Sequence, residues 1–198
     1  MMEDNNAFFN KMAPFYDYLA IVLQPFRLGV VDLVGTKQKV LDVACGTGAV
    51  GRMLAKKGND VVGVDSSHDM VEIGRKKAGK NPMFVVSDSS KMPFRKRTFD
   101  VSLITFAFHH MPREVILGTL DEMRRVTKKG GKIIIADVEK PSTLVSKLII
   151  NIPRIYESIH YVPFYSKGPN YFLNKAGLKI IKEEKKFFGS VKIIVCEN

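Results

Sequence analysis

The sequence has few of the residues that build metal sites and disulfide frameworks. Among 198 residues it has four histidines and two cysteines, Cys45 and Cys196. The cysteines lie too far apart in sequence to suggest a disulfide framework or a zinc ribbon, so we expect free thiols. His109 and His110 are neighbours. Because adjacent residues do not share a face of a helix or strand, we predict no metal site.

Long apolar runs and a basic, apolar leader are also missing. No segment approaches the roughly 18 uncharged apolar residues of a membrane-spanning helix. The first residues, Met1 to Asn6, are acidic and polar, unlike a secretory signal. We therefore expect a cytoplasmic protein.

Acidic residues are outnumbered, because 31 Lys and Arg against 20 Asp and Glu give a net charge of +11. Such a charge suits nucleic acid, an anionic membrane or an acidic substrate. However, the lysine pairs fall mostly at the ends of predicted helices, where cations favour the helix dipole. No aromatic residues interleave them, as they do in stacking platforms for nucleic acid. We interpret the charge mainly as a solvated surface, and a nucleic-acid partner is not expected.

The composition and length predict one globular domain over residues 1–198. Hydrophobic residues make up 45% and charged residues 26% of the chain, which is ordinary for a soluble protein. A chain of this length buries one good core but is short for two domains.

From Lys39 onward, β-branched runs alternate with helical patterns, which is typical of βαβ units and a parallel sheet. Strands are expected at 40–43, 61–64, 83–86, 100–106 and 132–138, and helices at 48–57, 66–79 and from Ile116 to before Gly130. The pattern predicts a Rossmann-like, doubly wound α/β core over residues 39–198.

The two ends of the chain depart from this alternation. An apolar helical stretch from Thr143 to His160, broken by Pro153, is followed by a short helix at 171–175. Strands at 178–184 and 191–196, joined through Gly189 and Ser190, predict an antiparallel hairpin that completes a seven-stranded, mostly parallel sheet. In residues 1–38, an apolar helical face predicts an N-terminal cover, with Phe8, Met12, Phe15 and Leu19 on it.

A glycine loop follows the first predicted strand. Gly46, Gly48 and Gly51 match the G-x-G-x-x-G spacing that lets a backbone approach a nucleotide, and Asp65 lies where an acidic side chain accepts hydrogen bonds from ribose hydroxyls. A nicotinamide or flavin cofactor fits this spacing. Asp42 favours another ligand, because a carboxylate near the loop repels a pyrophosphate but attracts the ammonium and sulfonium of S-adenosylmethionine. A purely structural Asp42, bonded to loop amides, is the alternative.

The run from Val40 to Gly48 resembles the first motif of class I S-adenosylmethionine-dependent methyltransferases. Later segments resemble that family's motifs in order: 64–67, 87–89 and 125–131. The resemblance implies that Asp65 takes the ribose hydroxyls, that Asp88 takes the adenine amino group, and that Gly46 and Gly48 approach the methionine portion. The full expected cofactor set is Tyr16, Asp42, Ala44, Gly46, Gly48, Asp65, Ser66, Met70, Asp88, Ser89 and Phe106.

Within that superfamily, the chain is most similar to the ubiquinone and menaquinone biosynthesis methyltransferases. The segments 13–17, 156–159 and 175–178 resemble that family's terminal motifs. This chain departs from the family by carrying His109 and His110 where an Arg-Asn pair is expected after the fourth strand. The resemblance implies a small, apolar or lipid-like, quinone-type acceptor, with S-adenosylhomocysteine as the other product.

Few catalytic residues are expected, because methyl transfer mainly needs alignment of nucleophile, methyl group and sulfur. His109 and His110 follow the fourth strand, at the edge where doubly wound folds place ligands, so either is a candidate base; a wall residue is the alternative. Asp137 and Glu139 follow the fifth strand and are expected to be solvated; a role in orienting the acceptor is the alternative.

Two other functions remain open at this point. One is an RNA methyltransferase, which rests on charge alone, since the Asn/Asp-Pro-Pro-aromatic motif of nucleic-acid amino-methyltransferases is missing. The other is a non-catalytic nucleotide-binding regulatory module. Apolar faces at the N-terminus and at Val145, Leu148, Ile149 and Ile152 also suggest peripheral contact with a membrane that presents the acceptor. Packing of these faces on each other or on the core is the alternative. The oligomeric state is not predicted.

Overall fold

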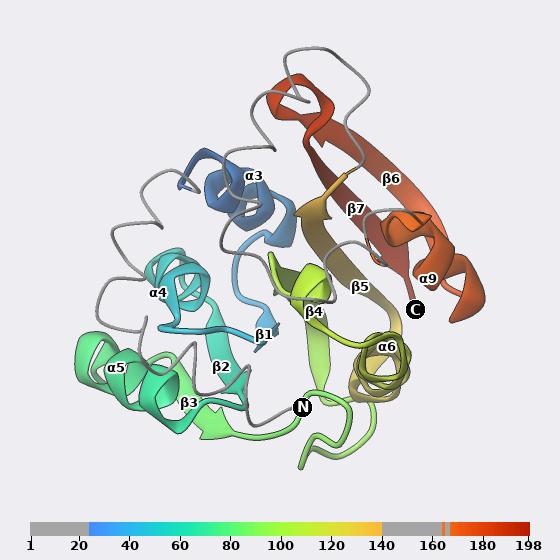
Figure 1. The fold of residues 1–198 in the computed structure, drawn as a ribbon. Coiled ribbons are helices and arrows are strands. Elements are labelled where there is room, and N and C mark those ends of the chain that lie inside the picture. The colour runs from blue at the N-terminus through green and yellow to red at the C-terminus, as the bar shows by residue number, and fades with distance from the viewer. Residues whose placement is uncertain (1–23, 140–163, 165–166) are drawn as a thin grey trace.

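A mixed sheet of seven strands organises the protein, in the order β3-β2-β1-β4-β5-β7-β6 (Figure 1). The computed structural model describes residues 24–139, 164 and 167–198. The first five strands pair in parallel, and β7 lies antiparallel between β5 and β6. Their bounds are β1 Lys39–Val43, β2 Asp60–Asp65, β3 Met83–Val86, β4 Phe99–Thr105, β5 Thr127–Val138, β6 Lys179–Lys186 and β7 Val191–Glu197. The predicted doubly wound sheet with an antiparallel C-terminal pair is confirmed.

Helices cover both faces of this sheet (Figure 1). They are α3 Gln24–Val34, α4 Ala49–Lys56, α5 His68–Ala78, α6 Arg113–Val126 and α9 Pro169–Lys175, with short 3-10 turns η1 Phe108–His110 and η3 Phe187–Gly189. Residues of α3 and α4 share one buried cluster with the sheet, and residues of α6 and α9 share the other. Val40 of β1 belongs to the first cluster and Leu41 to the second, because successive side chains of a strand point to opposite faces.

Several element boundaries differ from the predictions. Strand β5 begins at Thr127, five residues before the expected start at Lys132, and includes Gly130 and Gly131. A Cβ at Gly131 would lie 2.7 Å from the carbonyl oxygen of Asp100, so only glycine fits at this point of the sheet. Strand β6 continues to Lys186, two residues beyond its expected end at Glu184, and η3 then forms the hairpin turn.

The predicted helix at 143–160 and the apolar positions in residues 1–22 lie outside the described residues. Helix α3 confirms that the segment before β1 is helical in the part the structure describes. The predicted start of the second helix is also confirmed, since Ser67 caps α5 by accepting a hydrogen bond from the amide of Met70 at 3.2 Å.

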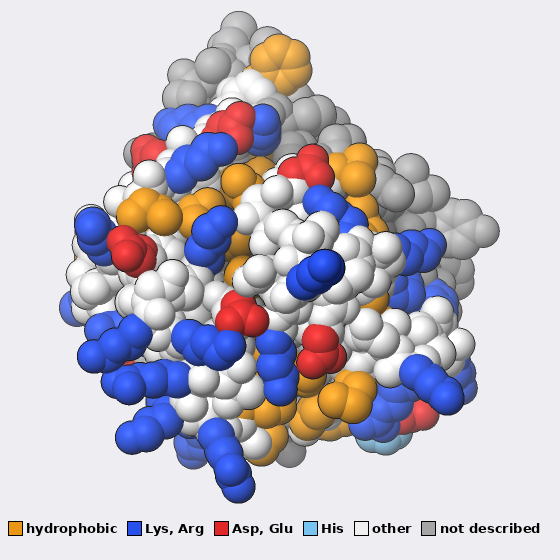
Figure 2. Space-filling view, turned by 180° about the vertical axis from the view of Figure 1, so that it is seen from behind, with side chains coloured by type: hydrophobic (Ala, Val, Ile, Leu, Met, Phe, Trp, Pro, Cys, Tyr) orange, Lys and Arg blue, Asp and Glu red, His pale blue; other side chains and the backbone are white. Residues whose placement is uncertain are grey.

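Basic side chains are spread over the surface. Figure 2 shows Lys and Arg across most of one face of the molecule, with Asp and Glu between them. Within the described residues, no helix is both long and apolar enough to cross a membrane. The distribution agrees with the interpretation of most of the positive charge as solvated surface.

The parallel pairing brings the ends of three central strands to one edge of the sheet. Strands β1, β4 and β5 run in the same direction, so Val43, Thr105 and Val138 end together. Strand β7 starts beside Val138, where its first residue, Val191, pairs with it. This carboxyl edge carries the residues described next.

Candidate functional site

The loop after β1 has a strained backbone held in place by hydrogen bonds. Ala44, Gly46 and Gly48 have φ values of 51°, 54° and 74°, in the left-handed region. The amide of Cys45 donates to the carbonyl of Val64 at 2.9 Å, and the amide of Gly48 donates to the carbonyl of Cys45 at 2.9 Å. Ala44 is the informative member, because a residue with a Cβ is strained in this conformation, and such strain collects at functional sites.

Gly48 also makes room for a side chain far away in sequence. A Cβ on Gly48 would overlap the ring of Phe84 on β3. Gly63 of β2 and Gly74 of α5 border the same ring, since a Cβ added at either would lie 2.9 Å or 3.1 Å from it, respectively. Three glycines therefore form a socket for Phe84, so Gly48 is required by packing as well as by its backbone conformation.

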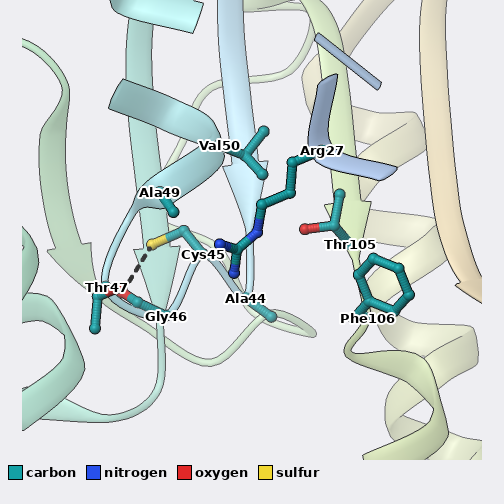
Figure 3. A pocket seen from close by; sticks show the side chains of 9 residues that line it. All are labelled: Arg27, Ala44, Cys45, Gly46, Thr47, Ala49, Val50, Thr105 and Phe106. Atoms are coloured by element: carbon teal, nitrogen blue, oxygen red, sulfur yellow. Dashed lines mark hydrogen bonds between the residues drawn. The ribbon is translucent and has the colours of Figure 1, made fainter. Parts of the chain in front are cut away.

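A hollow of about 340 Å³, counted with its open mouth, lies between this loop and the end of β4. Figure 3 shows the guanidinium of Arg27 reaching into it from α3, between the loop and Thr105 with Phe106. Phe106 also has a left-handed backbone, with φ 52°, and its amide donates to the carbonyl of Ala136 at 2.8 Å. The lining residues are Arg27, Ala44, Cys45, Gly46, Thr47, Ala49, Val50, Thr105 and Phe106.

Asp42 lies almost completely buried beneath the loop, with 1% of its surface exposed. Its Oδ2 accepts a hydrogen bond from the amide of Gly51 at 3.1 Å, whereas Oδ1 has no hydrogen-bond partner among the described residues. Burial raises the pKa of Asp42 from 3.8 to about 7, although the Gly51 amide and the charge of Arg27 act in the opposite direction. The protein thus keeps a destabilising carboxylate beneath the glycine loop without satisfying it fully.

Asp65, at the end of β2, is tied to the glycine loop. Its Oδ2 accepts from the amide of Gly46 at 2.7 Å, and its Oδ1 accepts from the amide of Ser67 at 2.9 Å. Burial raises its pKa, and the amides of Ser67, Gly46 and Ser66 oppose this. Ser66 is exposed beside it, while Met70 is only 2% exposed. Each carboxylate oxygen retains acceptor capacity for a further donor.

Asp88 and Ser89 follow β3, one strand further from the hollow. Asp88 Oδ1 accepts from the amide and the hydroxyl of Ser90, both at 2.8 Å. The hydroxyl of Ser89 is buried and pairs with that of Thr119 at 2.7 Å. Of the two, Asp88 is the side chain that is partly open to a ligand.

The two histidines form a pair on η1. Their ring centroids are 3.9 Å apart, so the expectation that adjacent histidines diverge is wrong here; the tight 3-10 turn brings the rings together. His109 is buried, and its Nδ1 lies 2.6 Å from Asp137 Oδ1. Across the described residues, no group of three or more His, Cys, Asp or Glu is arranged to hold a metal ion.

Asp137 is the carboxylate whose environment differs most from the expected one. It is 1% exposed, not solvated; the same expectation is wrong for Glu139, which is buried and pairs with Lys192 Nζ at 2.9 Å. Its Oδ2 also accepts from the amides of Ala107 and Phe108, at 3.2 Å and 2.9 Å. Because an ionised carboxylate only accepts, this contact favours a proton on Nδ1 of His109, so that Nε2 carries the lone pair when the ring is neutral. This is the tautomer that a general base needs, with its ring held by an orienting carboxylate.

The structure therefore brings together Ala44, Gly46 and Phe106 of the expected set, with Asp65 bonded to the loop. Tyr16 lies outside the described residues. The sequence interpretation did not single out Arg27, and it favoured a solvated Asp137 over one with a functional role. The available signals were a lone arginine in an apolar helix and a carboxylate at the end of a buried strand.

Comparison with known proteins explains the loop and the sheet. A family profile described as a methyltransferase domain matches residues 40–131. Residues 40–131 are a methyltransferase domain. The matched part begins at β1 and ends within β5, so it contains the glycine loop, Asp65, Asp88 and His109.

Curated relatives and solved structures agree with this domain. The chain is 37% identical over 142 residues to a demethylmenaquinone methyltransferase of Paenarthrobacter aurescens, covering 67% of this chain and 54% of the relative. It is 36% identical over 146 residues to the Thermotoga maritima enzyme of the same name, covering 68% and 62%. The matched part thus spans between about half and two thirds of those relatives.

The fold of the methyltransferase domain recurs in solved structures. A putative methyltransferase of Haloferax volcanii, solved with the Trm112 activator, superposes with a TM-score of 0.74 at 17% identity, over 96% of each chain. The magnesium protoporphyrin IX methyltransferase of Synechocystis, solved with bound S-adenosylhomocysteine, gives 0.66 at 18% identity over 90% of this chain and 84% of that one.

Proposed function

We propose that the chain binds S-adenosylmethionine and transfers its methyl group to a small, apolar, quinone-type acceptor. The observation that carries the proposal is the pairing of opposite charges at one hollow. The Arg27 guanidinium enters it, and Asp42, which is buried beneath the loop and interacts electrostatically with Arg27, has one carboxylate oxygen left unpaired by the described residues. A zwitterionic amino acid group needs one group of each charge. The methyltransferase domain profile supports the choice of ligand.

The residues present fit this cofactor. Arg27 would hold the carboxylate of the methionine portion, and the charge of Asp42 would favour its ammonium group. The remaining acceptor capacity of Asp65 suits ribose hydroxyls, and Asp88 suits the adenine amino group. Ala44, Gly46 and Phe106 line the hollow, and Gly48 shapes the loop. Ser66, Met70, Ser89 and Tyr16 stay predictions from the resemblance.

The protein's own part in the reaction is alignment and proton removal. The cofactor supplies an electrophilic methyl group on a sulfonium centre. His109, with Nδ1 held by Asp137, is the base that removes a proton from the acceptor, and Nε2 is the atom that takes it. His110 packs against the ring of His109 and limits its rotation.

Support for a quinone-type acceptor comes from the relatives, which are named demethylmenaquinone methyltransferases. An apolar acceptor of this kind is drawn from a membrane, so peripheral membrane contact is part of the proposal. RNA methylation has less support, because the basic side chains on the face that Figure 2 shows are interspersed with acidic ones.

Calorimetry with S-adenosylhomocysteine tests the cofactor assignment. We expect Arg27→Gln to weaken its binding about 10- to 100-fold, as loss of a charge-assisted hydrogen bond does. The same variant should bind 5′-methylthioadenosine, which lacks the amino acid group, as the parent protein does. The exposed Arg95 provides the control variant Arg95→Gln.

Further experiments test the assignment of Asp65 to the ribose hydroxyls and the choice of a quinone-type acceptor. Asp65→Asn should weaken both nucleoside ligands, and NAD should not raise the melting temperature. Isotopically labelled methyl donor, incubated with a short-chain demethylated naphthoquinol, should yield a labelled product by mass spectrometry. Binding of S-adenosylhomocysteine without turnover on quinone, lipid or RNA pools would instead support the regulatory module.

A further inference from the structure

Three cations surround one aromatic ring on the surface near the site. The ring centroid of Tyr171 in α9 lies 4.4 Å from Lys167 Nζ, 5.9 Å from Lys175 Nζ and 6.0 Å from the guanidinium carbon of Arg113. Arg113 comes from the first position of α6, so two helices contribute. All three basic residues are exposed. We call these four residues the Tyr171 cluster.

Within the part of the chain that the structure describes, these three cations have no acidic partner. Lys128, by contrast, pairs with Asp100 at 2.6 Å, and Arg125 pairs with Glu122 at 2.5 Å. Three like charges gathered around one ring repel each other, and only the ring's negative face offsets this in part. The arrangement is therefore one that an added anion stabilises.

The three cations also lower the pKa of the Tyr171 hydroxyl. Desolvation raises the pKa of Tyr171, but the neighbouring Lys167 and the charges of Arg113 and Lys175 outweigh it and lower that pKa. A positive potential thus extends over the ring, which is only half-buried.

A row of aromatic rings connects the Tyr171 cluster to the proposed base. Tyr171 meets Phe172 edge to face at 5.1 Å, Phe172 stacks on Phe164 at 5.5 Å, and Phe164 lies 6.5 Å from Phe108. Phe108 directly precedes His109 on η1. Phe108 and Phe164 are each 1% exposed and Phe172 is 3% exposed, so these packed core rings link the Tyr171 cluster to the turn that carries the proposed base.

We propose that the Tyr171 cluster docks the protein on the phosphate groups of an anionic membrane surface, an inference that rests on the proposed transfer to a membrane-borne, quinone-type acceptor. Lys and Arg reach toward lipid phosphates from the ends of long side chains, and a tyrosine with an apolar body and polar tip suits the same interface. Cations spaced around a ring match a sheet of separate headgroups better than the single cradle that one phosphate ion needs.

The test is sedimentation of the full chain with phosphatidylcholine vesicles, with and without phosphatidylglycerol, at low and high salt. The test variant replaces the three cations of the Tyr171 cluster by Gln. A matched variant removes the same charge at exposed lysines near the opposite, amino edge of the sheet: Lys56→Gln, Lys76→Gln and Lys80→Gln. Each cation near a membrane strengthens binding roughly 5-fold, so the test variant should lose on the order of 100-fold and the matched variant only a few-fold.

Three results would overturn the proposal: no binding of the parent protein to anionic vesicles, equal losses in both variants, or selective loss of single-stranded RNA binding in the test variant with vesicle binding unchanged.

Calorimetry with S-adenosylhomocysteine separates a failure of the docking surface from a failure of the proposed function. Both variants should bind it normally, since the lining of the hollow, as the described residues form it, includes none of the substituted positions. If the parent protein fails to bind it but sediments as expected, the cofactor assignment fails and the docking surface stands.

Discussion

Asp42→Asn should stabilise the fold while weakening cofactor binding. Burial raises the pKa of Asp42 from 3.8 to about 7, a difference of about three units. Each unit corresponds to about 1.4 kcal/mol, so the ionised carboxylate costs the folded state on the order of 4 kcal/mol relative to the protonated one.

The sign of the pH dependence follows from the direction of this shift. A carboxyl whose pKa is raised on folding favours the folded state fully below its unfolded pKa of 3.8, and this stability is lost as pH rises through about 7. Asparagine does not titrate. The variant should therefore gain roughly 3 kcal/mol relative to the parent protein between pH 5 and pH 8.

Urea unfolding at several pH values measures this difference, with the exposed Asp60→Asn as control. Calorimetry completes the test. In the parent protein, S-adenosylhomocysteine should bind more tightly as pH rises toward 7 and should release a fraction of a proton, because its ammonium favours the ionised Asp42. In the variant, binding should be about 10- to 100-fold weaker and independent of pH in this range. Parallel stability profiles for variant and parent would refute the reasoning.

The remaining predictions concern packing and proton removal. Gly48→Ala should destabilise the fold by about 3 kcal/mol or more in urea unfolding, because a Cβ overlaps the Phe84 ring, whereas Gly58→Ala, with similar φ but open space, should cost about 1 kcal/mol. Equal costs at the two positions would contradict the socket. Asp137→Asn should slow single-turnover methyl transfer about 100-fold or more with S-adenosylhomocysteine affinity retained, since His109 loses its preferred tautomer. An unchanged rate and pH profile would leave His109 as a wall residue.

Sequence reasoning located most of the sheet, because strand and helix periodicity is a local signal. It missed the start of β5 at Thr127, since Gly130 and Gly131 read as a turn until their pairing in the sheet is known. The division into an N-terminal cover at 1–38 and a core at 39–198 stays a prediction, as does the cytoplasmic location.

Within the candidate site, spacing along the chain was enough to identify the glycine loop, the acidic residue at the end of the second strand and the histidines after the fourth. What surrounds these residues became visible only in the folded chain. Folding places Arg27 in the hollow and Asp137 against His109, 28 residues away. Burial, electrostatic potential and tautomer depend on neighbours that are distant in sequence, and tertiary packing is what brings those neighbours together.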